Sequence, residues 1–497
     1  MNKIKRIFVS LLALATIGVA YSESKLIILH TNDTHSQIEP NDKNLGGVIR
    51  RKALIDSVKS EHSQVLVVDA GDAVQGTTYF NLYKGEAEQR VMNELGYDLR
   101  IVGNHEFDNG IDGVKLMLRE ANATFISTNY LFEDSMLRAR FVPYKIYTYG
   151  EKTVGFIALN INPQGLISDN NYDGVIYQDA FLTANNVAKQ LKEQKKVDIV
   201  VAITHLGYSD DIRLAEMSSD IDVIIGGHSH TLIDANDINS TLSYKVNNVN
   251  GQPVIVAQAD KTGRYVGEVI VDFETNDISS KVIKVDSRLD NRGDVEALNE
   301  IISSYKQGVD LLMSKPVVSI AMDMKRDEAP LQNLVCDMIY TQAKKLYEGK
   351  IDLAISNKGG IRCDLTKGVV SVGNIMSMLP FNNRIVVVEI NGSDLLSAFD
   401  VMARRGGDCV SAGVEAIIDY KAKKCVSVKI NGKEINPEQT YILATVDYLA
   451  NGGDYMTPLT NGLKIAASGN VLYEEMIDFM KSHDKMCISE ESRMTIK

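Results

Sequence analysis

Five apolar segments in the first half of the chain are each followed by residues that can bind a metal ion or move a proton. The motifs are Asp33-Thr34-His35, Gly71-Asp72, Gly103-Asn104-His105-Glu106-Phe107-Asp108, His205 and Gly227-His228-Ser229-His230. Aspartate, asparagine and histidine supply the oxygen and imidazole ligands that divalent metals accept. The chain has eight histidines, and five of them lie in these motifs, so we interpret the motifs as one site.

The segments that precede these motifs have the β-branched composition of buried strands. They are Leu26–Leu29, Val65–Val68, Leu99–Val102, Ile199–Ile203 and Val223–Ile225, with further strands at 154–158, 253–258 and 266–273. Helical spacing lies between them at 45–62, Gly85–Leu95, Ile111–Ala121, Ala180–Lys196 and Ile212–Met217. Strands that alternate with helices predict an α/β domain over residues 23–290, in which strand ends meet at one edge.

The second half has its own pattern. Residues 294–314 show charged helical spacing that stops at Pro316, which predicts a linking helix within 291–316. Beyond it, helices at Leu331–Leu346 and Gly392–Met402 alternate with strands at Leu353–Ser356, Ile385–Ile390 and Tyr441–Thr445. This pattern predicts a second α/β domain over residues 317–497.

The first 22 residues predict export. Lys3, Lys5 and Arg6 precede an apolar run and a small-residue exit at Ser22, as in a secretory signal peptide. The apolar run is short for a membrane span. No cysteine lies near the exit, which argues against a lipid-anchored form. We therefore expect a periplasmic or extracellular protein without a membrane span.

The net charge limits the kind of ligand that we expect, and the cysteine positions limit the possible disulfides. The net charge of −12 becomes about −15 once the three basic residues of the signal leave, which disfavours polymeric nucleic acid as a partner. A small phosphorylated ligand remains possible because metal ions supply local positive charge. All five cysteines lie in the second half without a Cys-x-x-Cys spacing, and Cys409 and Cys425 could pair across neighbouring strands.

The predicted ligands outnumber those of a structural zinc site, which needs four and leaves no open position. Seven ligands, with one aspartate shared, suffice for two divalent ions about 3.5–4 Å apart. Two such ions generate a hydroxide at neutral pH and hold phosphoryl oxygens during in-line displacement.

The order of these motifs resembles that of the calcineurin-like metallophosphoesterases. The chain from about residue 25 to 490 is similar to the 5′-nucleotidase family, which includes bifunctional UDP-sugar hydrolases. The resemblance implies an N-terminal four-layer αββα sandwich, a linking helix and a C-terminal α/β substrate-binding domain. In this family the C-terminal domain rotates about the linking helix, here 294–314.

The resemblance also implies a role for each residue of the site. One ion would take Asp33, His35, Asp72 and His230, and the other would take Asp72, Asn104, His205 and His228. The ions could be manganese, zinc, cobalt or magnesium. His105 would stabilise charge on the transferring phosphoryl group, with Asp108 as its carboxylate partner. The related 3′-nucleotidase branch usually has asparagine in place of Asp108, so this residue favours the 5′ branch.

Three segments of the second half resemble the family's substrate-binding loops. The residues implied are Asn357, Gly359, Gly360, Arg362, Phe381, Tyr448 and Asp454. Phe381 and Tyr448 would stack on the base from two sides, and Asp454 would accept a hydrogen bond from the ligand. Tyr448 stands where phenylalanine is common, which keeps the stacking surface.

These observations predict an exported enzyme that releases phosphate from nucleoside 5′-monophosphates by attack of a metal-activated hydroxide. Two other enzymatic activities stay open at this point: hydrolysis of UDP-sugars, and hydrolysis of 2′,3′-cyclic or 3′-nucleotides. A protein that binds nucleotides without hydrolysing them is the alternative from a different class. Oligomeric state cannot be read from these residues.

Overall fold

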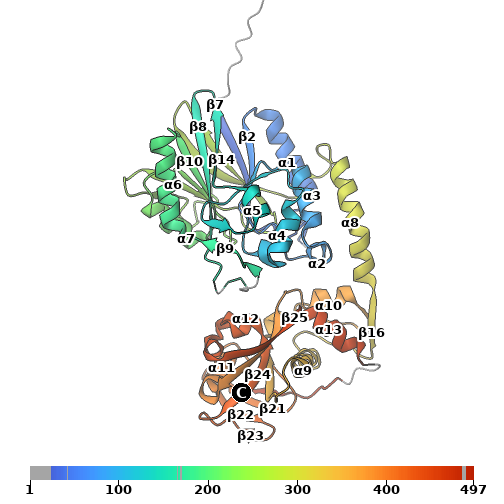
Figure 1. The fold of residues 1–497 in the computed structure, drawn as a ribbon. Coiled ribbons are helices and arrows are strands. Elements are labelled where there is room, and N and C mark those ends of the chain that lie inside the picture. Colours follow the sequence, from blue (N-terminus) through green and yellow to red (C-terminus); the bar gives the residue numbers. More distant parts are fainter. Residues whose placement is uncertain (1–23, 42, 165, 168–170, 484–487) are drawn as a thin grey trace, which may run out of the picture. The chain divides into compact units, whose positions relative to one another are not determined.

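The computed structural model describes residues 24–41, 43–164, 166–167, 171–483 and 488–497 (Figure 1). The predicted signal peptide, residues 1–22, lies outside the described residues. The chain divides into two compact units, with the change falling between Ile302 and Ser303. The domain boundaries predicted at 290 and 316 remain predictions. Within the described ranges, no helix has both the length and the apolar character that a membrane crossing requires.

The first unit contains two large sheets. One has the order β15 (Asp277–Lys284), β14 (Tyr265–Asp272), β1 (Lys25–Thr31), β2 (Val65–Asp69), β3 (Leu99–Arg100), β4 (Thr124–Ile126) and β6 (Phe141–Val142). The other has the order β12 (Lys245–Asn247), β13 (Pro253–Ala257), β11 (Val223–Ile225), β10 (Ile199–His205), β8 (Lys152–Asn160) and β7 (Tyr144–Tyr149). Parallel pairing joins β1, β2 and β3 in the first sheet and β8, β10, β11 and β13 in the second. The ends of these parallel strands therefore carry the loops to one edge.

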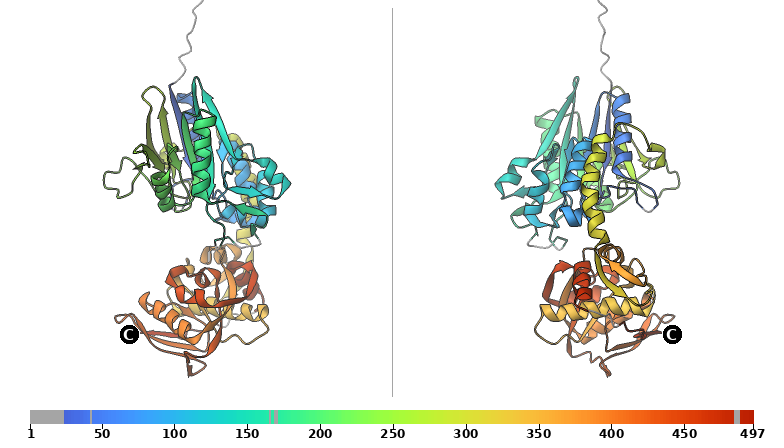
Figure 2. Two further views of the ribbon diagram at one scale, coloured as in Figure 1. Left: turned by 60° about the vertical axis from the view of Figure 1, so that its left-hand side comes forward. Right: turned by 90° about the vertical axis from the view of Figure 1, so that its right-hand side faces the viewer.

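Alternate side chains of both sheets form the core between them. Ile28 and Val68 from the first sheet pack with Phe156 and Val201 from the second, all fully buried. Helices α1 (Val48–Glu61) and α3 (Glu86–Leu95) lie outside one sheet, and α6 (Ala180–Gln194) and α7 (Tyr208–Met217) lie outside the other (Figures 1 and 2). Apolar residues of α6 and α7 and the outward residues of β8 and β10 form a second core layer. The predicted four-layer αββα sandwich is confirmed.

Shorter elements complete the first unit. They are α2 (Thr78–Tyr83), the 3₁₀ turn η1 (His105–Phe107), α4 (Gly110–Leu118), α5 (Ser135–Arg140) and the small β5–β9 ladder (Tyr130–Phe132 and Val175–Tyr177). Helix α7 begins at Tyr208, four residues before the helix predicted from Ile212, because Gly207 at φ 93° turns the chain directly after β10.

The second unit is also an α/β structure, as predicted. Its five-stranded sheet has the order β20 (Cys409–Val410), β17 (Leu353–Ser356), β24 (Thr440–Val446), β19 (Arg384–Asn391) and β25 (Leu463–Val471). A four-stranded sheet has the order β23 (Lys433–Glu434), β22 (Lys424–Ile430), β21 (Val414–Asp419) and β26 (Met494–Ile496), and β16 (Pro316–Ile320) pairs with β18 (Gly368–Ser371).

The helices of this half follow the predicted positions and add shorter ones. They are α8 (Glu296–Ser314), α9 (Ala329–Leu346), α10 (Val372–Met378), α11 (Gly392–Arg404), α12 (Asp447–Ala450) and α13 (Leu472–Lys481). Val335 and Ile339 of α9 are fully buried in one apolar core with the strands of the five-stranded sheet. This packing gives the second unit a core of its own.

A Cys409–Cys425 disulfide was a possibility that the structure contradicts. Both are free thiols, because Cys409 lies on β20 of the five-stranded sheet and Cys425 lies on β22 of the four-stranded sheet. Burial raises the pKa of the Cys409 thiol well above its ordinary value, which keeps it protonated and unreactive.

Candidate active site

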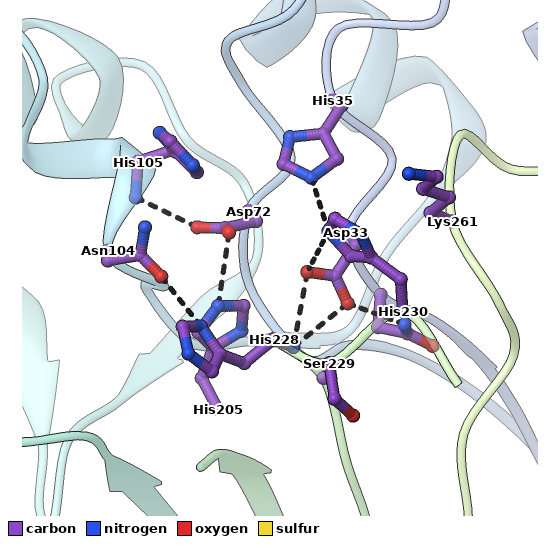
Figure 3. Close-up of polar contacts among 12 residues, drawn as sticks. Asp33, His35, Asp72, Asn104, His105, His205, His228, Ser229, His230 and Lys261 are labelled. Atoms are coloured by element: carbon purple, nitrogen blue, oxygen red, sulfur yellow. Dashed lines mark hydrogen bonds and ion pairs between the residues drawn. The ribbon is translucent and has the colours of Figure 1, made fainter. Parts of the chain in front are cut away.

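The predicted metal ligands gather at one edge of the two sheets in the first unit (Figure 3). Asp33 and His35 follow β1, Asp72 follows β2, and Asn104 follows β3. His205 is the last residue of β10, and the loop after β11 carries His228 and His230. The sheet ends therefore bring together all seven predicted ligands, which are separated by up to 197 positions in the sequence.

One group of ligand atoms belongs to Asp33, His35 and His230, and these atoms lie within 4.8 Å of one another. The two histidine Nε2 atoms are 2.9 Å apart, and His230 Nε2 is 3.5 Å from Asp33 Oδ1. Burial lowers the pKa of His35 to about 4 and that of His230 to about 3, so both rings are neutral near pH 7. Neutral imidazole is the form that binds a metal.

A second group contains Asp33, Asp72 and His205, whose ligand atoms also lie within 4.8 Å of one another. His205 Nε2 lies 3.1 Å from Asp72 Oδ2, and beside them His228 Nδ1 lies 3.0 Å from Asn104 Oδ1. Asp33 belongs to both groups, so the two groups adjoin. The division of the seven residues between two ions, with Asp72 shared, stays a prediction.

The chemistry of this donor set fits divalent cations. His205 Nδ1 is 2.7 Å from the carbonyl of Ala70, which orients the ring so that Nε2 faces Asp72. Burial lowers the pKa of His205, but the carboxylates of Asp72 and Asp33 outweigh it and raise the pKa to about 10. Burial raises the pKa of the neighbouring Asp33 to about 7, so both Asp33 and His205 hold protons more readily than usual, and a bound cation would take the place of these protons.

Five of the seven predicted ligands have left-handed backbone conformations. The residues are Asp33 (φ 48°), His35 (φ 47°), Asp72 (φ 53°), His228 (φ 74°) and His230 (φ 56°). Each such residue costs roughly 1–3 kcal/mol, and such residues cluster at functional sites. Aspartate and histidine tolerate this region better than most residues, so the same residue types supply both the ligand atoms and the turn.

His105 lies beside the ligands without belonging to either group. It begins the turn η1, and its N–H donates to Asp72 Oδ1 at 2.8 Å. Its Nδ1 is 3.0 Å from Asp108 Oδ2, as the predicted pairing requires. Burial lowers the pKa of His105, but the carboxylates of Asp72 and Asp108 raise it to about 9. A cationic imidazole therefore faces the site at neutral pH.

Glu106 has a role that the sequence analysis did not assign. Its side chain is buried, and its carboxylate accepts three backbone N–H groups: Asp72 at 3.0 Å, Ala73 at 2.9 Å and Gly103 at 2.6 Å. Burial and the charge of Asp72 raise the pKa of Glu106 to about 7. One side chain thus joins the loop after β2 to the loop after β3, and its place in the Gly103–Glu106 motif was the available signal.

The second unit brings several predicted substrate-binding residues together around Asp454. Its carboxylate accepts hydrogen bonds from Asn357 Nδ2 at 2.7 Å and from Tyr448 Oη at 3.2 Å. It also pairs with Arg405 at 2.7 Å, a residue that the sequence analysis missed because nothing in its local sequence indicates this partner. A Cβ atom added at Gly360 would lie 3.0 Å from Asn357 Oδ1, so the glycine permits this close packing.

Phe381 and Tyr448 are each 44% exposed, which leaves ring surface for a ligand. The guanidinium of Arg362 lies 5.8 Å from the centre of the Phe381 ring, and its Nη1 donates to the carbonyl of Gly359. Arg362 and Phe381 therefore lie together, as do Tyr448 and Asp454. Stacking of a base between the two rings remains a prediction.

Comparisons with known proteins agree with this architecture. Residues 26–232 match the family model of the calcineurin-like phosphoesterases, and residues 314–461 match that of the 5′-nucleotidase C-terminal domain. The chain belongs to the 5′-nucleotidase family. Like the other members, it is a metal-dependent phosphoester hydrolase, and the predicted enzyme class is confirmed.

Individual relatives in this family extend over nearly the whole chain. The trifunctional nucleotide phosphoesterase YfkN of Bacillus subtilis is 30% identical over 92% of the chain, which spans about a third (34%) of that relative. Snake venom 5′-nucleotidase of Crotalus adamanteus is 29% identical over 97% of this chain and 90% of the relative. The crystal structure of a 5′-nucleotidase precursor from Thermus thermophilus is 29% identical, with a TM-score of 0.71 over 95% of this chain and 99% of that one.

Proposed function

We propose that this family member releases inorganic phosphate from nucleoside 5′-monophosphates with two divalent ions. The observation that carries the proposal is a pair of adjoining ligand groups that share Asp33 and lie beside a cationic histidine. A single structural ion would need neither the second group nor His105. The proposed ligands are Asp33, His35, Asp72, Asn104, His205, His228 and His230.

The chain's own residues would act as follows. When bound, the ions would supply positive charge to the phosphoryl oxygens and a nucleophile at neutral pH. His105 would donate a charge-assisted hydrogen bond to the transferring phosphoryl group, where negative charge increases in the transition state. Asp108, 3.0 Å from its ring, would hold the imidazole in orientation and keep it protonated.

The nucleoside would bind to the second unit. Phe381 and Tyr448 offer aromatic surface for stacking, which is worth about 1–3 kcal/mol for each base. Asp454 and Asn357, which already contact each other, would offer hydrogen bonds to the ligand, and Arg362 would contact its negative charge. The names of several relatives, all 5′-nucleotidases, support this substrate class.

The deciding experiment measures phosphate release from AMP, 3′-AMP, 2′,3′-cyclic AMP and UDP-glucose. Each substrate is tested with metal-stripped protein and again after addition of manganese, zinc, cobalt or magnesium. Metal-dependent release from AMP above the others is the expected result. A higher rate on another substrate would replace the proposed specificity, and no release from any would contradict the proposal.

Hydrolysis of UDP-sugars or cyclic nucleotides is the second candidate, and the Bacillus relative, named a trifunctional nucleotide phosphoesterase, supports more than one activity on nucleotide phosphoesters. We also propose that residues 1–22 direct export to the periplasm or the medium. N-terminal sequencing of protein from the exported fraction tests this, and a first residue near Glu23 is expected. An intact Met1 in that fraction would contradict cleavage.

A further inference from the structure

Lys261 is a charged side chain beside the proposed metal site that neither the motifs nor the proposed mechanism uses. It lies on the His35 and His230 side, whereas His105 and Asn104 lie on the other side of the two aspartates (Figure 3). The side chain of Lys261 therefore shares one side of the site with the two histidines of the first ligand group.

The Lys261 ammonium has no partner among the residues that the structure describes. The nearest carboxylate in sequence, Asp260, is paired with Arg264 at 2.6 Å. Asp33 is held by the N–H of His228 and by Asn32 Nδ2. Lys261 is half-buried as a residue while its ammonium still reaches solvent, so the three donors of that group are available to an anionic ligand.

The backbone around Lys261 is held firmly in an unfavourable conformation. Asp260 (φ 61°) and Thr262 (φ 54°) are both left-handed, and a β-branched residue is a rare occupant of that region. The N–H of Thr262 donates to the carbonyl of Asp33 at 2.7 Å, and Asn32 Nδ2 donates to the carbonyl of Asp260 at 2.6 Å. These contacts fix Lys261 against the strand end that carries Asp33, which indicates a positional requirement.

Charge balance indicates what this position binds. Asp33 and Asp72 cancel half of the charge of two divalent ions and leave two positive charges, while His105 and Asp108 cancel each other. A phosphodiester with one negative charge, together with an attacking hydroxide, matches that surplus. A phosphomonoester dianion brings one negative charge more, and the Lys261 ammonium is the cation available to balance it.

We propose that Lys261 binds a non-bridging oxygen of a terminal, dianionic phosphoryl group and thereby favours phosphomonoesters over phosphodiesters. Without such an anion, an ammonium held next to two divalent ions would only repel them. The inference rests on the proposed phosphohydrolase function, whose nucleoside specificity it does not require. It assigns the preference for a monoester to the first unit.

The test compares Lys261→Met and Lys261→Arg with the unchanged protein on two substrates that share a leaving group, p-nitrophenyl phosphate and bis-p-nitrophenyl phosphate. We expect Lys261→Met to lower kcat/KM on the monoester about tenfold and to change the diester less than about twofold. Lys261→Arg should restore most of the loss because it keeps the charge. Lys245→Met, at an exposed lysine of β12, removes the same charge elsewhere and should change neither.

A binding measurement separates this inference from the proposed function. Inorganic phosphate should raise the Tm of the metal-loaded protein, and Lys261→Met should weaken that phosphate binding about tenfold while metal content stays the same. Equal losses on monoester and diester, or unchanged phosphate binding, would overturn the role of Lys261. Absence of turnover in the unchanged protein would contradict the proposed function, and phosphate binding would still decide the role of Lys261.

Discussion

Replacement of Glu106 by glutamine tests whether this one carboxylate holds two ligand loops together. The substitution keeps the shape of the side chain but turns one acceptor oxygen into an amide NH₂ group. Oε2 accepts the N–H groups of Asp72 and Gly103, and Oε1 accepts that of Ala73. In either orientation, the amide NH₂ faces at least one buried N–H that then lacks an acceptor.

The cost follows from counting those donors. With the amide oxygen in the Oε2 position, only the Ala73 N–H is unsatisfied, and a buried unsatisfied donor costs about 1–3 kcal/mol. The opposite orientation leaves both the Asp72 and Gly103 N–H groups unsatisfied, so the variant should adopt the first. The pKa of Glu106, raised to about 7, shows that burial beside Asp72 opposes its ionisation, and glutamine avoids this cost. We therefore expect Glu106→Gln to lower the free energy of unfolding by about 1 kcal/mol, or the Tm by roughly 2–4 °C.

Thermal and urea unfolding of the metal-stripped protein measure this loss directly. Glu120→Gln, at an exposed glutamate of the same unit, is the matched control and should stay within about 0.5 kcal/mol of the unchanged protein. Glu106→Ala removes all three acceptor contacts and should also weaken metal binding, measured by titration calorimetry. If Glu106→Gln unfolds with an unchanged free energy, the three contacts do not stabilise the loops and the reasoning fails.

Three further results are expected. Asp108→Asn should lower the pKa of His105, because it removes the carboxylate that favours the cationic ring, so the cationic form is lost earlier as the pH rises and the alkaline limb of kcat/KM moves to lower pH; an unmoved limb would separate Asp108 from catalysis. Phe381→Ala and Tyr448→Ala should each raise KM for AMP about tenfold and leave p-nitrophenyl phosphate unchanged, and equal losses on both substrates would reject the stacking role. Manganese at about one hundred times its Kd should stabilise metal-stripped protein by about 2.7 kcal/mol for each bound ion, about 5.4 kcal/mol for two, and the loss of this effect in Asp33→Ala would locate the ions.

The sequence predicted the strand ends and the candidate ligand residues that gather there, because short apolar strands followed by Asp, Asn or His are a local pattern. It could not predict Arg405 as a partner of Asp454, since that contact joins two loops separated by 49 positions. The four-stranded sheet of the second unit was also missed, because β22 mixes two lysines and a serine with its apolar residues and so lacks the apolar run of a buried strand. The sequence did not indicate a role for Lys261, because this residue lies in no recognisable motif. Its place beside the site depends on the hydrogen bonds that hold the backbone on either side of it.

The left-handed conformations of the predicted ligands lower the stability of the fold, yet the site requires the residues that adopt them. Glycine adopts such conformations without steric cost, so a Gly at His35 or His230 would relieve backbone strain by the same substitution that removes a ligand. A search for more heat-resistant variants, selected by unfolding temperature alone and without metal, would therefore drift toward inactive proteins. Selection in the presence of the metal would reverse this drift, because bound ions stabilise the variants that keep the metal ligands.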